Sequence, residues 1–203
     1  MIKEIIVYNS GYINCKSNFY TSHDTLQERD VYQFNSGVNR LFGDIDSGIW
    51  GISYLLSMYN IDINSKALFN PHIALVDGKE VHLSELSKRC CYLDHKHYPL
   101  FSSKRKSVRK LIESGIKKSG TSLTCDEIAD MFLLDNCRIE RPIYCVGNER
   151  FRAMAAVGFA FGKEVFCFPW LSKKMIDYYG NNINLLLELL ESIGVVAIVP
   201  SGR

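Results

Sequence analysis

The sequence predicts an α/β protein built on a mostly parallel sheet, with a β-hairpin region and an inserted helical subdomain. The runs "VFCF" and "VVAIV" are continuously apolar, which is typical of strands covered on both faces by helices. The stretch "NNINLLLELLESIG" carries apolar residues at helical spacing. An Asp-Gly pair lies between two short strand-like runs, as in a tight hairpin. The 203 residues fit a single domain over 1–203, and we place the helical subdomain at about 102–145.

Composition excludes several classes of protein. Hydrophobic residues make up 47% of the chain, which is enough for a core and too much for global disorder. The net charge of +2 gives no indication of a nucleic-acid partner, and no apolar run is long enough to span a membrane. The N-terminus lacks the apolar region of a signal peptide. The seven cysteines form no C-x-x-C pair, so we expect free thiols in a reducing cytoplasm rather than a zinc site or disulfides.

The first half of the chain reads as strands around a glycine-containing loop. "EIIVYN" is a strand-like run, and "VYQFNSGVNRLFG" is a second apolar stretch around a Ser-Gly turn. After Gly48 the apolar residues change to helical spacing, beginning with Ile52. "HIALVDGKEVHLSEL" predicts a hairpin that turns at Asp77 and Gly78. "RCCYLDHKHYPLF" predicts a short strand and then an irregular loop closed by Pro99.

The second half alternates helices with buried strands. "SVRKLIESGIKK" and "TCDEIADMFLLD" predict helices, and in the second of these Thr124 and Glu127 have capping-box spacing. "NERFRAMAAVGFAFG" predicts a helix that ends at Gly162, and "KEVFCFPW" a buried strand stopped by Pro169. "NNINLLLELLESIG" predicts a helix that ends at Gly194, followed by a last strand in "VVAIVP".

The stretch "LFGDIDSGIWGISYLLS" has the outline of a phosphate-binding loop. Gly43, four residues, Gly48 and an apolar helix follow one another, but the Lys and hydroxyl residue of a working G-x-x-x-x-G-K-[ST] loop are missing. A carboxylate about 4 Å from a phosphate charge costs on the order of 4 kcal/mol at an effective dielectric of about 20. Since the loop carries Asp44 and Asp46, we expect its shape without its phosphate chemistry. The two carboxylates then cap the helix, or alternatively they bind a cationic, hydroxyl-rich or metal ligand.

Two further clusters leave alternatives open. Asp94, His95 and His97 could hold a metal ion, but no further ligand set accompanies them, so we expect a solvated loop and no metal. The basic run "SSKRKSVRK" is a solvated helix start or, alternatively, a docking patch for an acidic partner or a membrane surface.

The order of these elements resembles the nucleotide-binding domain of ABC transporters over nearly the whole chain. "SGVNRLFGDIDSGIWGISYLLS" is similar to that family's strand, Walker A loop and first helix, and "IALVDGKEVHLSEL" to its β-hairpin. "YLDHKHYPLFSSKRKSVRKLI" resembles the stretch from the Q-loop into the helical subdomain, and "YCVGNERFRAMAAVGFAFGKEVFCFPWLS" the signature motif, its helix and the Walker B strand. "LLELLESIGVVAIVPS" resembles the final helix and the strand before the switch histidine. The resemblance implies a P-loop-NTPase-like, ABC ATPase-like fold.

The motifs that would bind and hydrolyse ATP are altered. In the Walker A register Ile49 replaces the phosphate-binding Lys and Trp50 the magnesium-binding hydroxyl; the nucleotide-loop-like residues are Gly43, Asp44, Asp46, Ser47, Gly48, Ile49 and Trp50. In the signature register "LSGGQ" has become "CVGNE"; the signature-like residues are Gly147, Asn148, Glu149 and Arg152. In the Walker B register Pro169 and Trp170 replace the magnesium-binding Asp and the catalytic Glu. The Q-loop register has no Gln, and Ser201 replaces the switch histidine.

The resemblance and the departures together predict an ABC-ATPase-like subunit that does not hydrolyse ATP. Such a pseudo-ATPase would act as a partner or scaffold in a transport or peptide-related assembly, as a homodimer or as a heterodimer with an ABC-type ATPase, and with a membrane permease as a further candidate partner. We expect no catalytic residue, no cofactor and no nucleic acid. The expected location is the cytoplasm or, through a partner, the membrane periphery. We also expect the rings of Trp50 and Trp170 to lie near the loop and to occupy or line the space of a nucleotide.

Two alternatives remain. The first is an ATP-binding ABC-type ATPase with an atypical site, and only this alternative brings ATP and magnesium as cofactors. The second is an enzyme or a small-ligand binder that reuses the pocket through Asp44 and Asp46.

Overall fold

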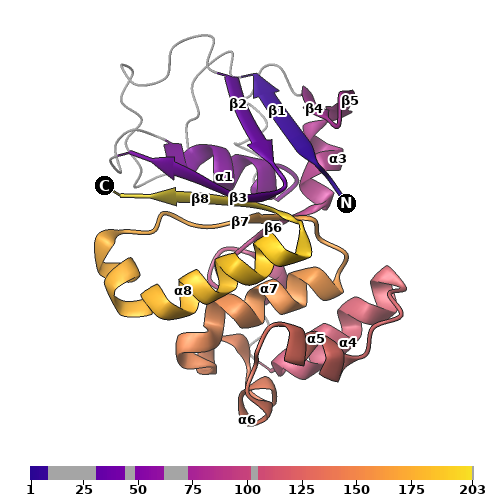
Figure 1. Cartoon of the computed structure of the whole chain (residues 1–203). Helices are drawn as coiled ribbons and strands as arrows, with labels where there is room; N and C mark the ends of the chain where they lie inside the picture. The colour runs from indigo at the N-terminus through magenta and orange to yellow at the C-terminus, as the bar shows by residue number, and fades with distance from the viewer. Residues whose placement is uncertain (9–30, 44–48, 62–72, 102–104, 203) are drawn as a thin grey trace.

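Two four-stranded sheets form the framework of the protein in the computed structural model, which describes residues 1–8, 31–43, 49–61, 73–101 and 105–202. The antiparallel sheet has the order β2-β1-β4-β5, and the parallel sheet has the order β3-β8-β7-β6. Figure 1 shows the antiparallel sheet above the parallel one. The predicted α/β class is therefore confirmed, and the hairpin belongs to a separate sheet rather than to an edge of the central one.

The antiparallel sheet joins the first strands of the chain to the predicted hairpin. It contains β1 (Glu4–Tyr8), β2 (Val31–Asn35), β4 (Ile73–Val76) and β5 (Lys79–His82). At the hairpin turn Asp77 has φ +49° and Gly78 has φ +75°, as a two-residue primed turn requires. The Asp77 carboxylate accepts hydrogen bonds from the backbone N–H groups of Lys3 and Glu4, at 2.8 and 2.9 Å, and so fixes the turn to β1.

The parallel sheet is the buried centre of the molecule. Its strands are β3 (Gly37–Phe42), β6 (Cys90–Tyr92), β7 (Val165–Cys167) and β8 (Val196–Ser201). Every residue of β6, β7 and β8 is buried, as the continuous apolar runs predict.

A single residue joins the two sheets. β2 ends at Asn35 in the antiparallel sheet, and β3 begins at Gly37 in the parallel sheet. The backbone N–H of Ser36 donates to Lys3 O, and that of Gly37 donates to Val195 O. Gly37 has φ +95°, so the change of sheet occurs at a backbone conformation that favours glycine.

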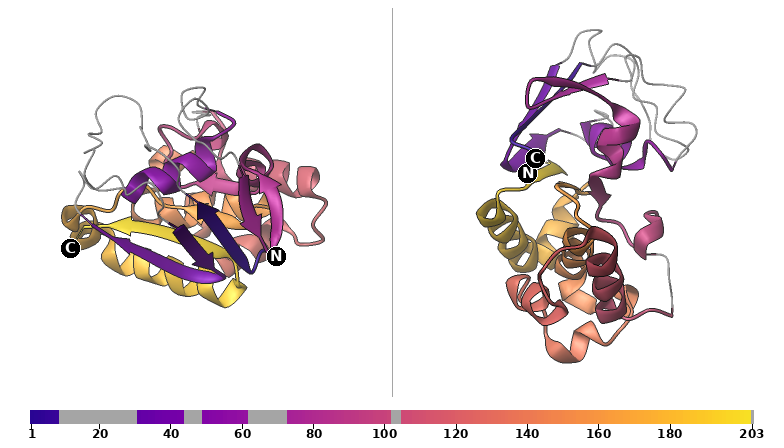
Figure 2. Two further views of the ribbon diagram at one scale, coloured as in Figure 1. Left: turned by 90° about the horizontal axis from the view of Figure 1, so that it is seen from above. Right: turned by 90° about the vertical axis from the view of Figure 1, so that its right-hand side faces the viewer.

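Helices cover both faces of the parallel sheet. Figures 1 and 2 show α1 (Ile49–Met58) and α3 (Leu83–Lys88) on the side of the antiparallel sheet, with α7 (Arg150–Ala160) and α8 (Lys173–Ile193) on the opposite side. The sequence did not predict α3, whose residues were placed in the hairpin. α8 begins at Lys173, eight residues before the predicted "NNINLLLELLESIG" segment and directly after the N-cap Ser172, and it ends as predicted at Gly194 with φ +77°.

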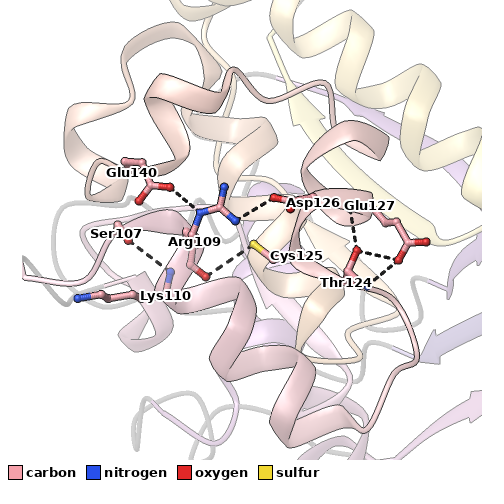
Figure 3. A network of polar contacts seen from close by, with 8 residues as sticks. All are labelled: Ser107, Arg109, Lys110, Thr124, Cys125, Asp126, Glu127 and Glu140. Carbon is pink, nitrogen blue, oxygen red and sulfur yellow. Dashed lines mark hydrogen bonds and ion pairs between the residues drawn. The ribbon is translucent and has the colours of Figure 1, made fainter.

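The chain between Arg105 and Cys145 carries the helices α4 (Val108–Ser119), α5 (Cys125–Met131) and α6 (Asn136–Ile139), and the 3-10 turn η3 (Ile143–Cys145). The predicted capping box at the start of α5 is present: Thr124 Oγ1 accepts from the Glu127 N–H, and Glu127 accepts from the Thr124 N–H. Arg109 of α4 binds Asp126 at 2.8 Å and also Glu140, so one guanidinium ties three parts of this region together (Figure 3). A separate subdomain at about 102–145 stays a prediction, since residues 102–104 lie outside the described ranges.

Close packing between helices depends on two glycines. A Cβ added at Gly115 of α4 would lie 2.7 Å from Phe161 Cδ2 and 2.8 Å from the Ala160 backbone carbon. A Cβ added at Gly158 of α7 would lie 2.7 Å from Cys91 Sγ on β6. Both distances are shorter than real contacts allow, so α7 can approach α4 and the sheet only because these residues lack a side chain.

Candidate functional site

The candidate site is the carboxyl edge of the parallel sheet, where open α/β sheets bind their ligands. β3 reaches this edge at Gly43, whose buried N–H donates to Ser201 O at 3.2 Å. Asp44, Asp46, Ser47 and Gly48 lie outside the described residues, and the chain is described again from Ile49, the first residue of α1. The strand and the helix on either side of the predicted loop are therefore present. The side chains of Ile49 and Trp50 are not described, so the predicted place of the Trp50 ring stays a prediction.

The Walker-B-like residues form a bulge at the end of β7. The Phe168 N–H donates to Ile198 O at 2.9 Å, and the next ladder bond runs from the Leu171 N–H to Pro200 O at 3.0 Å. Pro169 and Trp170 thus lie opposite one residue of β8, Pro200. Proline has no N–H to give to a ladder, and prolines within sheets occur at such bulges.

Trp170 is half-buried beside the core and lies next to the end of β8. A Cβ added at Gly202 would lie 3.5 Å from Trp170 Cζ2. The bulge therefore places an indole ring, and no carboxylate, at the end of the central strand β7.

The Ser53 hydroxyl donates to a backbone carbonyl oxygen, that of Phe168, which has no donor in the sheet. In a parallel ladder with this pairing, the N–H of residue 200 would donate to Phe168 O, and Pro200 cannot donate. The buried Ser53 hydroxyl on α1 donates to Phe168 O instead, at 2.6 Å. α1 is thereby fixed to the carboxyl edge one turn after Ile49.

Ser201, in the register of the switch histidine, is buried at the end of β8. Its side-chain Oγ has no hydrogen-bond partner among the described residues. The parallel bridge between Leu171 and Ser201 and the bond from the Gly43 N–H place it between the ends of β7 and β3. Its side chain has no imidazole to reach a ligand from this position.

The signature-like segment forms a short turn, η4 (Gly147–Glu149), that leads directly into α7. Gly147 has φ +70°, and both Gly147 and Asn148 are exposed. Arg138 of α6 supports the turn, because its Nη1 donates to Val146 O at 2.9 Å. The turn therefore presents backbone and an amide side chain to solvent.

Glu149 does not face solvent with them. Its carboxylate lies 3.6 Å from Arg138 Nε and 3.5 Å from Arg152 Nη2, and it accepts a hydrogen bond from the Asp135 N–H at 3.2 Å. Arg152 is buried and also donates to the Leu133 backbone oxygen and to Asn182 of α8. Burial lowers the pKa of Arg152 from its ordinary range, and Glu149 opposes that shift. Glu149 and Arg152 thus tie α7 to its neighbours.

The histidine cluster lies in a turn after β6, where the sequence predicted a loop. His97 Nδ1 is 2.7 Å from Asp94 Oδ2, and His95 Nδ1 is 4.0 Å from Asp94 Oδ1. Within the described ranges no group of three or more His, Cys, Asp or Glu side chains could hold a metal ion.

Two residues of this region had no sequence prediction: Ser53 and Arg138. Ser53 sits within an apolar helix, and Arg138 lies in a charged surface segment, so neither has a distinguishing pattern. The structure places Arg150 beside the rings of Phe151 and Tyr179.

The parallel sheet with helices on both faces, joined to an antiparallel sheet, is the fold of ABC-type ATPases. No protein-family model matches the sequence, and no curated protein matches it. Among solved structures, a chain from Pyrococcus furiosus described as an ABC transporter ATP-binding protein matches with a TM-score of 0.62 at 13% identity, covering 98% of this chain and 92% of that one.

Two further solved structures also match the fold of this chain. The protein cbiO1 from Clostridium perfringens, part of the ABC transporter complex cbiONQ, matches with a TM-score of 0.61 at 15% identity, covering 100% of this chain and 79% of that one. An ATP-binding subunit of an ABC transporter matches with a TM-score of 0.57 at 11% identity, covering 98% and 79%. At these identities the likeness shows the fold, and the resemblance inferred from the sequence is confirmed at that level. No helix in the described ranges has the length and apolar content to cross a membrane.

Proposed function

We propose that this chain is an ABC-ATPase-like subunit that does not hydrolyse ATP and works as the partner or scaffold of an ABC-type ATPase. The bulge at the end of β7 carries the proposal. Phosphoryl transfer depends on positioning and on charge stabilisation at the metal and the attacking water. Pro169 and Trp170 offer neither a metal ligand nor a base where β7 reaches the site.

Three other positions support the same function. Ile49 and Trp50 replace the Lys and the hydroxyl residue that would hold phosphate and magnesium, and Ser201 lies buried in the register of the switch histidine. The chain therefore needs no nucleotide chemistry of its own in this proposal, and we expect no bound cofactor.

The proposed partner follows from the fold. The solved neighbour cbiO1 is part of an ABC transporter complex. We propose that this chain likewise pairs with a second copy or with another ABC-type ATPase, in an assembly that can include a membrane permease. It would then work in the cytoplasm or at the membrane periphery.

Phosphate release at millimolar Mg-ATP tests the catalytic part of the proposal. We expect no turnover above buffer, and no difference between the wild-type chain and the variant Gly48→Asp. Turnover in the wild type that disappears in Gly48→Asp would refute the proposal and favour an active ABC-type ATPase.

Tryptophan fluorescence tests nucleotide binding separately, because Trp50 and Trp170 are the only two tryptophans. We expect no saturable change on addition of Mg-ATP. A saturable quench that is abolished by Asp44→Ala or Ser47→Ala, and assigned to one ring with Trp170→Phe, would establish an ATP-binding subunit with an atypical site.

A further inference from the structure

Leu133, shortly after the end of α5, is an exposed leucine in a backbone conformation that leucine rarely adopts. Its φ is +51°, and the residue is 50% exposed. The Leu133 N–H donates to Asp130 O at 3.0 Å, and the N–H of Leu134 donates to Ala129 O at 2.9 Å. Many helices end in such a turn, and its left-handed position is usually a glycine, because a Cβ is strained there. A glycine would carry less strain, so the turn alone does not account for the leucine.

The turn is attached to the helices behind it through one buried side chain. Arg152 of α7 donates to the carbonyl oxygen of Leu133, and its Nη2 donates to Asn182 Oδ1 on α8 at 3.2 Å. Leu133 therefore lies on a surface that continues onto the middle of α8, and its backbone is held in place while its side chain is exposed.

Two carboxylates flank the exposed leucine. Asp130 and Asp135 are both exposed, and neither forms a salt bridge in the part of the chain that the structure describes. Asp135 accepts from the Cys137 N–H at 2.8 Å, which fixes its position at the start of α6. An apolar side chain between two negative charges is complementary to an apolar hollow with positive charges beside it.

The first turns of α8 form a hollow of that kind, which we call the α8 hollow. It has a volume of about 470 Å3 and is lined by Lys174, Met175, Asp177, Tyr178 and Tyr179. Tyr178 is 70% exposed, and its ring meets that of Tyr179 edge-on, with the centres 4.6 Å apart. Tyr178 precedes Asn182 by four residues, so the hollow and the turn of Leu133 lie on neighbouring parts of one surface.

Positive charge predominates beside the α8 hollow. Lys173 and Lys174 are exposed, and no salt bridge engages them within the described ranges. The guanidinium carbon of Arg150 lies 5.6 Å from the centre of the Tyr179 ring. Against these three cations the lining residues include one carboxylate, that of Asp177.

We propose that Leu133 of one copy inserts into the α8 hollow of a second copy of this chain. The carboxylates beside Leu133 then face the lysines beside the hollow. Because both parts lie on one surface, a two-fold axis between them produces the same contact twice. The surface includes neither the glycine-containing loop nor the signature-like turn. The inference rests on the proposed pairing with a second copy and identifies the residues that make it.

Sedimentation equilibrium of the full chain measures the dissociation constant of the dimer. Leu133→Gly should raise it by about tenfold or more, because the change removes an apolar anchor from each half of the interface. At concentrations where the chain is monomeric, the same variant should raise the Tm by roughly 2 °C, because glycine relieves the left-handed position. The matched control is Ile73→Thr, at a residue of β4 that is 39% exposed and lies outside this surface; it should leave the dissociation constant unchanged.

Charge reversal tests which surfaces meet. At low ionic strength Asp130→Lys and Lys174→Glu should each raise the dissociation constant by about tenfold, since each places like charges opposite one another. The double variant restores opposite charges and should bind within about threefold of wild type. Circular dichroism confirms that each variant is folded.

The inference is overturned if the wild-type chain remains monomeric, if Leu133→Gly dimerises as the wild type does, or if the double variant binds no better than the single ones. Dimerisation lost in Tyr178→Ala but kept in Leu133→Gly would mean that the α8 hollow has another occupant, and would also overturn it. None of these results changes the phosphate-release assay, so this surface can fail while the non-hydrolytic function stands. ATP turnover in a chain that passes the charge-reversal test would refute that function and leave the surface in place.

Discussion

The hydroxyl of Ser53 donates a 2.6 Å hydrogen bond to the carbonyl oxygen of Phe168, which Pro200 leaves without its ladder partner. Phe168 and Ser53 are both fully buried, so no solvent could satisfy that carbonyl. One side chain on α1 thus completes the hydrogen bonding of the parallel sheet next to the bulge. This hydrogen bond joins α1 to the residue directly before the Walker-B-like Pro169 and Trp170.

We expect Ser53→Ala to lower the free energy of unfolding by about 1–3 kcal/mol, because the buried Phe168 carbonyl loses the hydroxyl that donates to it. Urea denaturation followed by circular dichroism measures the effect. Ser192→Ala is the matched control, since that exposed helix serine donates to Leu189 O and its loss should change stability by less than about 0.5 kcal/mol. Equal effects of the two changes would show that the Ser53 bond contributes nothing particular.

Glu149→Gln should destabilise the protein by about 1–2 kcal/mol. The change removes the charge that faces Arg138 and the buried Arg152, while an amide oxygen can still accept from the Asp135 N–H. Thermal unfolding measures the shift, with Glu113→Gln on the exposed face of α4 as the control. An unchanged midpoint for Glu149→Gln would mean that the two arginines find other partners at no cost.

Two glycine substitutions in helices should have opposite signs. Gly158→Ala would bring a Cβ to 2.7 Å from Cys91 Sγ and 3.1 Å from Phe166 Cε1, and overpacking of this kind typically costs about 1–3 kcal/mol. Gly180→Ala lies within α8 with no atom within 4 Å of the added Cβ, and should stabilise by about 0.5–1 kcal/mol. Chemical denaturation of both variants is the measurement. Stabilisation by Gly158→Ala would contradict the close approach of α7 to β6.

The stability of the hairpin should depend on acid pH through Asp77. Its backbone hydrogen bonds to Glu4 and Lys3 lower the pKa of Asp77 in the folded protein. The folded chain therefore binds the proton less tightly than the unfolded chain, whose Asp pKa is about 3.9. The stabilisation is complete above that value and is lost as the pH falls through the lower folded-state pKa.

Asp77→Asn separates this charge effect from the hydrogen bonds. The variant keeps an oxygen acceptor and tolerates φ +49°, so it should be less stable than wild type at neutral pH, with a difference that shrinks in acid. Asp77→Ala should lose the acceptor at every pH. A constant difference between wild type and Asp77→Asn across the acid range would contradict the linkage.

Much of the fold could be predicted because its signals are local. The Asp77-Gly78 turn, the Thr124 capping box and the glycine that ends α8 each depend on neighbours in sequence, and all three are present. The helix α3 was missed because only six residues separate His82 from Arg89, too few for a helical period to stand out. Its N-cap is a histidine, which accepts from the Ser84 N–H through Nδ1, and histidine is not among the residues that usually mark a helix start.

The candidate site was less predictable because its contacts join residues far apart in sequence. Resemblance placed Pro169, Trp170 and Ser201 at the edge of the sheet, and the structure has them there. It could not show that Ser53 would serve Phe168, 115 residues away, or that Glu149 would turn inward to two arginines. Asp44, Asp46, Ser47 and Gly48 lie beyond the ranges that the structure describes, so their roles stay predictions.

The bulge at Pro169 and Trp170 has a consequence for anyone comparing this chain with intact ABC-type ATPases. Four steps of chain lead from Cys167 to Leu171, while the paired residues Ile198 and Ser201 are three steps apart. If this chain is aligned without a gap to a strand that lacks the bulge, each residue after the bulge is shifted by one position. Since side chains alternate along a strand, the shift assigns those residues to the opposite face of the sheet. Superposing β7 on a strand that lacks this bulge therefore requires a one-residue gap between Phe168 and Leu171.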